Sequence, residues 1–265
     1  MVPSVVAEES GYWNNVADEW TGAETDVVWR RHSDAVNLAL LRRWLPGEPI
    51  RRLLKTDLFD EAVSEGLFPG LEPHAQTVVG MDLAPRTIGR ARAHGSFPLS
   101  ACTDVRRLPF PDGCFDVVVS NSTLDHFTSF HAILGSLREL HRVLLPGGQL
   151  LLTMDNLANP LIALRNSLPF VLWKRLGLVP YFVGTTCGPR RLRRAVLSVG
   201  FKLLETTAIM HCPRVLMVRR ARKLQAEGRP EAQARFLRRL MRYEILARWP
   251  TRFLTGYFVA VRCVK

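Results

Sequence analysis

The sequence predicts an α/β protein built on a mostly parallel β-sheet with helices on both faces. Short apolar stretches at residues 51–56, 77–83, 115–121 and 149–155 have the length and composition of buried strands. Apolar residues with helical spacing occur between them, as in "APRTIGRARAHG" and "HAILGSLRELHRVLLPGG". Buried strands that alternate with helices are typical of a parallel sheet covered on both sides.

The two ends of the chain depart from this alternation. Residues 12–45 have a helical pattern that stops at Pro46-Gly47, so we expect residues 1–48 to form an N-terminal helical cover and residues 49–265 the main domain. The stretches 200–211 and 255–265 both have strand character, which predicts an antiparallel hairpin at one sheet edge. Two inserts interrupt the main domain, at about 156–186 and at 212–254, the second of them basic and mostly helical.

The charge of the chain is concentrated near its C-terminus. The formal net charge is +12, and residues 189–265 hold 19 Lys and Arg against 4 Asp and Glu. Such a segment can meet nucleic acid, anionic lipid or an acidic substrate, or it can be a solvated basic helix.

Composition also bounds where the protein works. With 265 residues, 47% of them hydrophobic, the chain is long enough for one sizeable domain with additions. Its most apolar stretch, at 160–183, is broken by charges and prolines, and we expect neither a membrane span nor a secretory signal. The five cysteines are scattered without a Cys-x-x-Cys pair, so we expect neither zinc nor a disulfide framework and predict a cytoplasmic protein.

Three stretches carry the chemistry. In "VVGMDLAPRTIGRAR", Asp82 closes a strand, where a carboxylate can accept both hydroxyls of a ribose or can cap the next helix. In "CTDVRRLPFPDGCFDVVVSNSTLDHF", Asp104 precedes a turn, and the strand after it delivers Asn121 to the same sheet edge. The third stretch, "LRELHRVLLPGGQLLLTMD", is a helix, a tight turn and a strand.

In this order and spacing the three stretches resemble the class I S-adenosylmethionine-dependent methyltransferases, and most closely the small-molecule enzymes with a "D…LPF…FD" signature. The resemblance covers residues 50–155 and implies a Rossmann-like, seven-stranded, mostly parallel sheet with S-adenosyl-L-methionine as cofactor. It also implies that Asp82, with Leu83, binds the ribose of the cofactor. Asp104 and the backbone N–H of Val105 would bind the adenine, and Asn121 would lie beneath the methionine portion.

The first loop of this chain departs from that family. In "RRLLKTDLFDEAVSEG", Lys55 stands where the family has an acid, and Asp57, Phe59 and Glu61 stand where it has glycines. Glycine lets the backbone approach a ligand and adopt positive φ angles. Side chains at these positions therefore require a rebuilt turn if the cofactor is to bind.

Two interpretations of the loop remain open. In the first, Asp57 pairs with a positive group of the cofactor and Lys55 binds its carboxylate, with charge-assisted hydrogen bonds of about 1.5–3 kcal/mol each. In the second, Lys55 and Asp57 form an internal pair, Asp60 and Glu61 favour the positive end of a helix, and the site is empty.

Candidate catalytic residues are less clearly marked. His126, just past the fourth strand, is placed to deprotonate an acceptor hydroxyl, or else it caps a helix or packs against "FTSFH". Asp125 beside it is another candidate. His211 is a second candidate base, which with Arg214 would bind an anionic acceptor or stabilise a turn. Two more histidines fall in a helical pattern that indicates a structural role, namely His131 and His141.

Aromatic residues mark two segments that we expect to close over an acceptor. They are Tyr12, Trp13, Trp20 and Trp29 in the N-terminal cover, and Phe170, Trp173, Tyr181 and Phe182 in the 156–186 insert, here interpreted as an acceptor lid. Pockets with such linings suit an apolar or aromatic acceptor, although most of these rings can also serve simply to pack helices.

The expected function is methyl transfer from S-adenosylmethionine to a small or lipid-like acceptor, most often at oxygen. One alternative is an RNA-directed methyltransferase, but the basic insert lacks an interleaved aromatic platform for bases. Its amphipathic basic helix suits an anionic membrane surface or a partner equally well. The other alternative is a non-catalytic binding module that has lost the cofactor.

Overall fold

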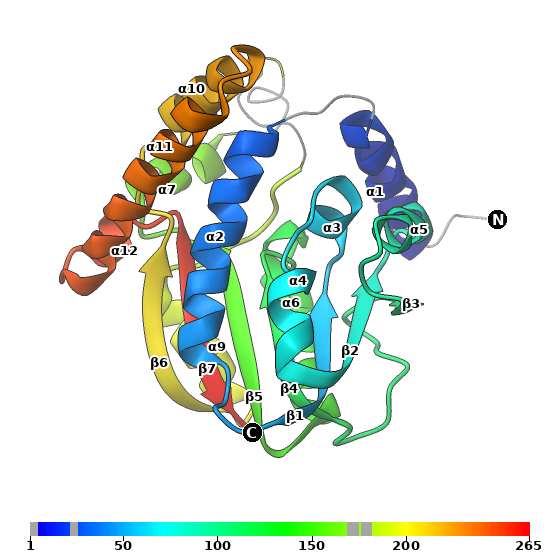
Figure 1. The fold of residues 1–265 in the computed structure, drawn as a ribbon. Helices are drawn as coiled ribbons and strands as arrows, with labels where there is room; N and C mark the ends of the chain where they lie inside the picture. Colours follow the sequence, from blue (N-terminus) through cyan, green and yellow to red (C-terminus); the bar gives the residue numbers. More distant parts are fainter. Residues whose placement is uncertain (1–4, 22–25, 169–174, 176–181) are drawn as a thin grey trace.

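The protein has a three-layer α/β architecture (Figure 1). The computed structural model describes residues 5–21, 26–168, 175 and 182–265. In this part of the chain seven strands form one sheet in the order β3-β2-β1-β4-β5-β7-β6. The strands are β1 (Ile50–Thr56), β2 (Ala75–Asp82), β3 (Leu99–Cys102), β4 (Phe115–Asn121), β5 (Leu144–Asp155), β6 (Lys202–Ile209) and β7 (Phe258–Val264).

The predicted fold class is confirmed, including the antiparallel edge. Strands β3, β2, β1, β4 and β5 are parallel neighbours, whereas β7 pairs antiparallel with both β5 and β6. Thus β6 forms the edge, and the chain makes a long helical excursion before β7 returns beside it. The four-residue strand β3 was not predicted, because "LSAC" is too short to show a strand pattern.

Both faces of the sheet are buried, which explains the nearly continuous apolar runs in its central strands. Leu53 packs in one core cluster and its neighbour Leu54 in the other. The first cluster includes residues from α2 (Val27–Trp44), α4 (Phe68–Leu71), α5 (Pro85–Ala93), α10 (Arg214–Ala226) and α11 (Pro230–Met241). The second includes residues from α6 (Phe130–Val143) and α9 (Pro189–Ser198).

The predicted N-terminal cover consists of two helices with different surroundings. Helix α2 packs on the sheet, where Trp44 is fully buried and its indole N–H donates to Glu205 of β6 at 2.8 Å. Helix α1 (Val5–Thr21) contacts α3 (Phe59–Val63) and α5 beyond the carboxyl ends of the strands (Figure 1). Of these two helices, α1 therefore lies over the edge of the sheet where a ligand would bind.

The two inserts add helices around the same end of the molecule. The basic insert forms α10, α11, η3 (Arg242–Arg248) and α12 (Arg252–Thr255), and both α10 and α11 pack against α2. The other insert begins with α7 (Pro160–Ser167). Phe170, Trp173 and Tyr181 lie outside the described residues, and so does the side chain of Trp20. The remaining short helices are η1 (Glu72–His74) and η2 (Leu124–His126). Among the helices described, none is long and apolar enough to cross a membrane.

Candidate active site

A cavity of about 490 Å³ lies at the carboxyl ends of β1, β2 and β4, where ligands bind in open parallel sheets. Its wall is completed by α1 and by the loops after β3 and β4. Seven of the nine predicted site residues line it, namely Asp57, Asp82, Leu83, Asp104, Val105, Asn121 and His126. The other two, Lys55 and His211, are not among its lining residues.

The loop after β1 shows how the chain dispenses with glycines. Asp57 has a φ of 69°, the left-handed conformation that a glycine would supply and that Asp tolerates better than most residues. Its backbone N–H donates to the carbonyl of Met81 at 2.8 Å, and its carboxylate accepts the N–H of Phe59, also at 2.8 Å. Phe59 and Glu61 already belong to helix α3, where side chains are accommodated. Only one of the three substituted positions therefore needs a positive φ.

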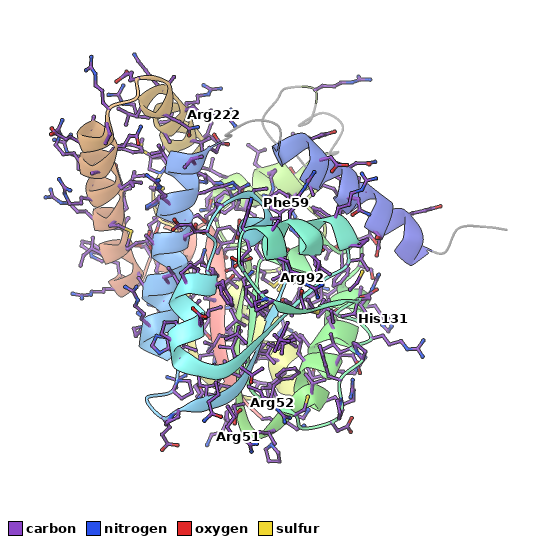
Figure 2. The ribbon with its side chains drawn as sticks, turned by 45° about the vertical axis from the view of Figure 1, so that its right-hand side comes forward. Arg51, Arg52, Phe59, Arg92, His131 and Arg222 are labelled. Carbon is purple, nitrogen blue, oxygen red and sulfur yellow. The ribbon has the colours of Figure 1, made fainter. Side chains whose placement is uncertain are left out.

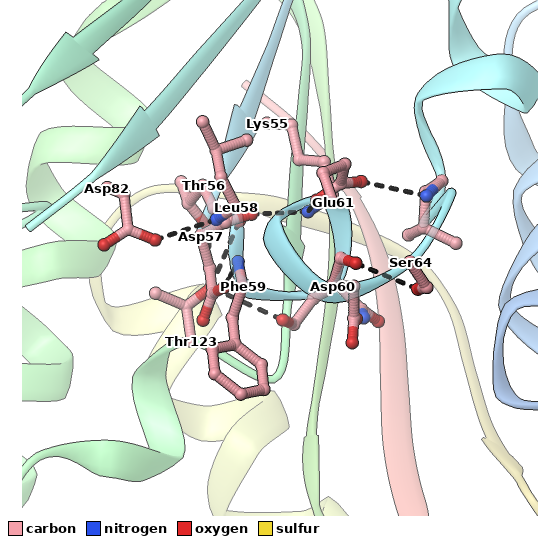
Figure 3. Close-up of polar contacts among 12 residues, drawn as sticks. Lys55, Thr56, Asp57, Leu58, Phe59, Asp60, Glu61, Ser64, Asp82 and Thr123 are labelled. Carbon is pink, nitrogen blue, oxygen red and sulfur yellow. Dashed lines mark hydrogen bonds and ion pairs between the residues drawn. The ribbon is translucent and has the colours of Figure 1, made fainter. Parts of the chain in front are cut away.

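Lys55 has a structural role in this loop. Its ammonium group is 2.9 Å from the Glu61 carboxylate and also donates to the backbone carbonyl of Asp57 (Figure 3). Both side chains are almost completely buried. Burial alone lowers the pKa of Lys55, but the charges of Glu61 and then Asp57 raise it above its usual value. The expectation that Lys55 binds the cofactor carboxylate is corrected, because its charge is satisfied inside the loop.

Gly66 makes room for this ion pair, although it comes too late in the chain to shape the turn after β1. It has a φ of 60°, and a Cβ atom there would lie 2.6 Å from the Glu61 carboxylate. The Glu61 carboxylate oxygen that does not contact Lys55 accepts the backbone N–H of Leu67 at 2.9 Å. The pair thereby ties the end of β1 to the chain that follows α3.

Asp82 lies at the end of β2 and faces the cavity with most of its surface buried. Its two carboxylate oxygens accept the backbone N–H groups of Leu58 at 2.9 Å (Figure 3) and Ala84 at 2.7 Å. Burial raises the pKa of Asp82, and burial followed by the charge of Asp82 raises the pKa of Asp57 well above its usual range. A positive group in the cavity would favour the charged forms of both acids.

In the loop after β3, the neighbouring strand of β2, Asp104 is held by Arg106. The guanidinium reaches both carboxylate oxygens of Asp104 and also pairs with Glu9 of helix α1. Arg106 further stacks on the ring of Phe127 at 4.8 Å. This network attaches α1 to the loop after β3. The sequence signal for it is the pair of opposite charges, Asp104 and Arg106, on either side of Val105. The roles predicted for Asp104 and Val105 remain proposals.

The lining of the cavity is acidic. Three of its acids also pair with arginines outside the lining, which join Arg106 to Glu9 and Asp104, and Arg30 to Asp60. Among the described residues, its lining contains six acids and neither lysine nor arginine. The acids are Glu8, Glu9, Asp57, Asp60, Asp82 and Asp104. The sequence did not mark Glu8 and Glu9, because they lie on the N-terminal helix, outside the region of the family resemblance. A cavity of this kind favours a ligand with positive charge.

The two candidate histidines have different environments. His126 lines the cavity, with Nδ1 at 3.0 Å from the carbonyl of Phe182 and its ring packed edge-on against Trp13. His211 lies between Thr255 and Ala208, with one ring nitrogen 2.8 Å from the Thr255 hydroxyl and the other 3.0 Å from the Ala208 carbonyl. Burial lowers its pKa. The expectation that His211 is catalytic is therefore corrected to a structural role at the end of β6.

Aromatic side chains form part of the wall, as predicted for Tyr12, Trp13 and Phe182. The Tyr12 hydroxyl accepts the backbone N–H of Phe182 at 2.7 Å, which joins α1 to the second insert. Phe59 also lines the cavity, and its ring leaves the space open.

Known proteins share this fold and part of this sequence. Residues 64–152 match the family described as "Methyltransferase domain", and the match starts just after the Lys55–Glu61 loop. A demethylmenaquinone methyltransferase of Thermus thermophilus is 39% identical over 131 residues, which are 47% of this chain and 53% of that protein. The chain thus spans about half the length of this curated relative.

Solved structures extend the likeness to nearly the whole fold. The protein in complex with the Trm112 methyltransferase activator of Haloferax volcanii has a TM-score of 0.60 at 16% identity, covering 94% of this chain and 96% of that one. An S-adenosylmethionine-dependent methyltransferase from Mesorhizobium loti has a TM-score of 0.53 at 19% identity, covering 86% and 96%. Residues 64–152 thus match a methyltransferase domain, and the solved structures share the fold of nearly the whole chain.

The buried ion pair yields a stability prediction. Glu61→Gln should lower the free energy of unfolding by about 3–5 kcal/mol, because it leaves the Lys55 ammonium buried without its counter-charge. Chemical denaturation followed by circular dichroism measures the change.

The double variant Lys55→Met/Glu61→Leu serves as the matched control. It removes both charges together, so it should recover most of the stability that the single variant loses. A Glu61→Gln protein as stable as the wild type would contradict the assigned role of the pair.

Proposed function

We propose that the protein transfers the methyl group of S-adenosylmethionine to a small or lipid-like acceptor. The observation that carries this proposal is the acidic cavity at the carboxyl ends of β1, β2 and β4, in a fold shared with methyltransferases. The cofactor has a sulfonium and an ammonium group, so its positive charge suits a lining that holds six acids. Asp82, Asp104 and Val105, which we expect to bind the adenosine portion of the cofactor, all line this cavity.

The residues of the cavity divide the binding task. Asp82 would bind the ribose hydroxyls, and Asp104 with the N–H of Val105 would bind the adenine. Asp57 would face the positively charged end of the cofactor. Asn121 is positioned by a threonine hydroxyl on β5, which donates to its side-chain oxygen at 2.7 Å. The bound cofactor supplies a methyl group already activated by the sulfonium.

The protein's part in the reaction is alignment and exclusion of water. Helix α1 closes one side of the cavity through Arg106, and Ser10 on the same helix donates to the carbonyl of Leu83 at 3.0 Å. If the attacking atom is a hydroxyl, His126 is a lining residue suited to accept its proton. Transfer to oxygen remains part of the proposal.

A lipid-like acceptor is favoured by the relative that is named a demethylmenaquinone methyltransferase. Phe59, which lies in the wall of the cavity, suits an apolar group placed beside the cofactor. The non-catalytic module remains the second candidate, because the first loop carries its own internal ion pair.

Cofactor binding is the first test. We expect S-adenosylmethionine to bind the wild-type protein, and Asp82→Ala to weaken binding by about 1–3 kcal/mol through loss of charged hydrogen bonds. Asp57→Asn should weaken S-adenosylmethionine more than S-adenosylhomocysteine, which lacks the sulfonium charge. Isothermal titration calorimetry measures all of these affinities.

Glu48→Gln is a suitable control, because this acid lies in the loop before β1 and does not line the cavity. No heat from the wild-type protein at millimolar cofactor would leave only the non-catalytic module.

We further propose that the basic insert brings the protein to anionic membranes, where a lipid-like acceptor would reside. Residues 212–254 contain 12 Lys and Arg against 3 Asp and Glu. Trp249 and Leu254, at the corner of η3 and α12, are each 56% exposed. Basic residues beside exposed apolar groups are typical of peripheral membrane contacts.

Vesicle flotation tests this contact. The wild-type protein should float with vesicles that contain phosphatidylglycerol and not with pure phosphatidylcholine, and a Trp249→Ser/Leu254→Ser variant should float several-fold less. Leu99→Ser is the matched control, because Leu99 is 55% exposed on the distant edge strand β3. Equal flotation of both variants would contradict the assignment of this corner, and retention of RNA instead of vesicles would favour the RNA-directed alternative.

A further inference from the structure

A second cavity of about 270 Å³ adjoins the first. The two share lining residues at their common wall, which are Phe59, Asp60, Asn121, Ser122 and His126. A molecule in the second cavity would therefore lie next to a cofactor in the first, and the two would meet at these shared side chains. This placement fits the methyl acceptor.

Helix α10 of the basic insert supplies one side of this cavity. Its residues Arg214, Val215, Val218, Arg219 and Arg222 form one stripe along the helix, and all of them line the cavity. Figure 2 shows Arg222 in the same half of the molecule as Phe59, whereas Arg51 and Arg52 lie at the opposite end. The sequence had marked this insert as basic and amphipathic, and had named Arg214 as a candidate to bind an anionic acceptor.

Arg214 is positioned by aromatic rings. Its guanidinium lies 4.4 Å from the ring centre of Tyr257, 5.8 Å from that of Trp29 and 5.9 Å from that of Phe258. Contacts of this kind orient a guanidinium and leave its positive charge in place. The same rings give the cavity an apolar wall beside a positive group.

All four acids of the second cavity have contacts within the protein, although the buried Oδ1 atom of Asp125 has no hydrogen-bond partner among the described residues. Three of them form ion pairs, which join Arg30 to Asp60, Arg165 to Asp155 and Arg222 to Asp26. Burial raises the pKa of Asp155 above its usual value. The positive charge of Arg214 opposes this rise. The fourth acid, Asp125, is 1% exposed, and its carboxylate accepts the N–H of Asp155 at 2.7 Å and the hydroxyl of Ser122 at 3.1 Å.

The second cavity has an excess of positive charge. Its described lining holds four acids and five arginines, which are Arg30, Arg165, Arg214, Arg219 and Arg222. Arg219 is exposed at the rim, where its guanidinium can reach a molecule that enters from solvent. The first cavity has the opposite charge, so two reactants of opposite charge would each be favoured on their own side of the shared wall.

We propose that the second cavity is the acceptor site and takes a molecule with an aromatic or apolar body and an anionic group, either carboxylate or phosphate. The body would pack against Trp29 and Tyr257, and Arg214 with Arg219 would bind the anionic group. The acceptor role rests on the proposed methyltransferase function, whereas the preference for anions belongs to the cavity itself.

Three small probes with the same ring test this preference. Benzoate and phenyl phosphate carry an anionic group, and benzamide is the neutral counterpart of benzoate. Titration of the full chain, followed by NMR of the protein, should give at least about fivefold tighter binding of the anions than of benzamide. The ranking of benzoate against phenyl phosphate identifies which anionic group the site prefers.

Variants of helix α10 locate the effect. Arg214→Gln should weaken benzoate about tenfold, and Arg219→Gln about threefold because this side chain is exposed. Arg220→Gln is the matched control, because Arg220 is exposed on the same helix and does not line the cavity. Benzamide affinity should be unchanged by Arg219→Gln and Arg220→Gln, so a general loss of folding is separable from a loss of charge recognition.

The outcomes separate the two proposals. Equal affinity for benzoate and benzamide, or an Arg220→Gln loss as large as that of Arg219→Gln, overturns the anion site even when S-adenosylmethionine binds. If the cofactor gives no heat while benzoate still depends on Arg214 and Arg219, the methyltransferase proposal and the acceptor role fail, and the anion preference alone stands.

Discussion

The arrangement of the site depends on the buried ion pair between Lys55 and Glu61. In an apolar environment a lone ammonium or carboxylate is costly, so each of these residues constrains the other, and together they fix the turn between β1 and α3. In this turn Asp57 adopts a left-handed conformation, and the backbone N–H of Leu58 donates to the Asp82 carboxylate. A loop that glycines would shape through backbone freedom is shaped here through charge.

Acidic and basic side chains are distributed unequally between the two cavities. The described lining of the first cavity contains neither lysine nor arginine, although Arg30 and Arg106 pair with three of its acids from outside the lining. Arginine side chains are instead collected in the second cavity, on α2, α7 and α10. The molecule therefore places an acidic cavity beside a basic one, with Phe59 in the lining of both, and this arrangement suits two reactants of opposite charge.

Much of the fold could be predicted from the sequence, because buried parallel strands such as "FDVVVSN" and helices such as "HAILGSLREL" carry strong periodic signals. The gathering of Asp82 and Asp104 at one cavity could also be predicted, because their positions after strands are set by topology. The role of Lys55 could not be predicted, because spacing alone could not tell whether its charge meets Glu61 or a ligand. His211 was misplaced because it follows β6, the outermost strand of the sheet, whereas the cavity lies over β1, β2 and β4, and the sequence does not reveal the strand order.

The central claim is that an internal ion pair shapes the loop while the surrounding acids receive the cofactor. A crystal structure of the protein with S-adenosylhomocysteine tests it most directly. The account predicts the ribose against the Asp82 carboxylate and the Lys55 ammonium still on Glu61. A Lys55 side chain turned toward the carboxylate of the ligand, or a ligand bound elsewhere with Phe59 filling the crevice, would contradict it.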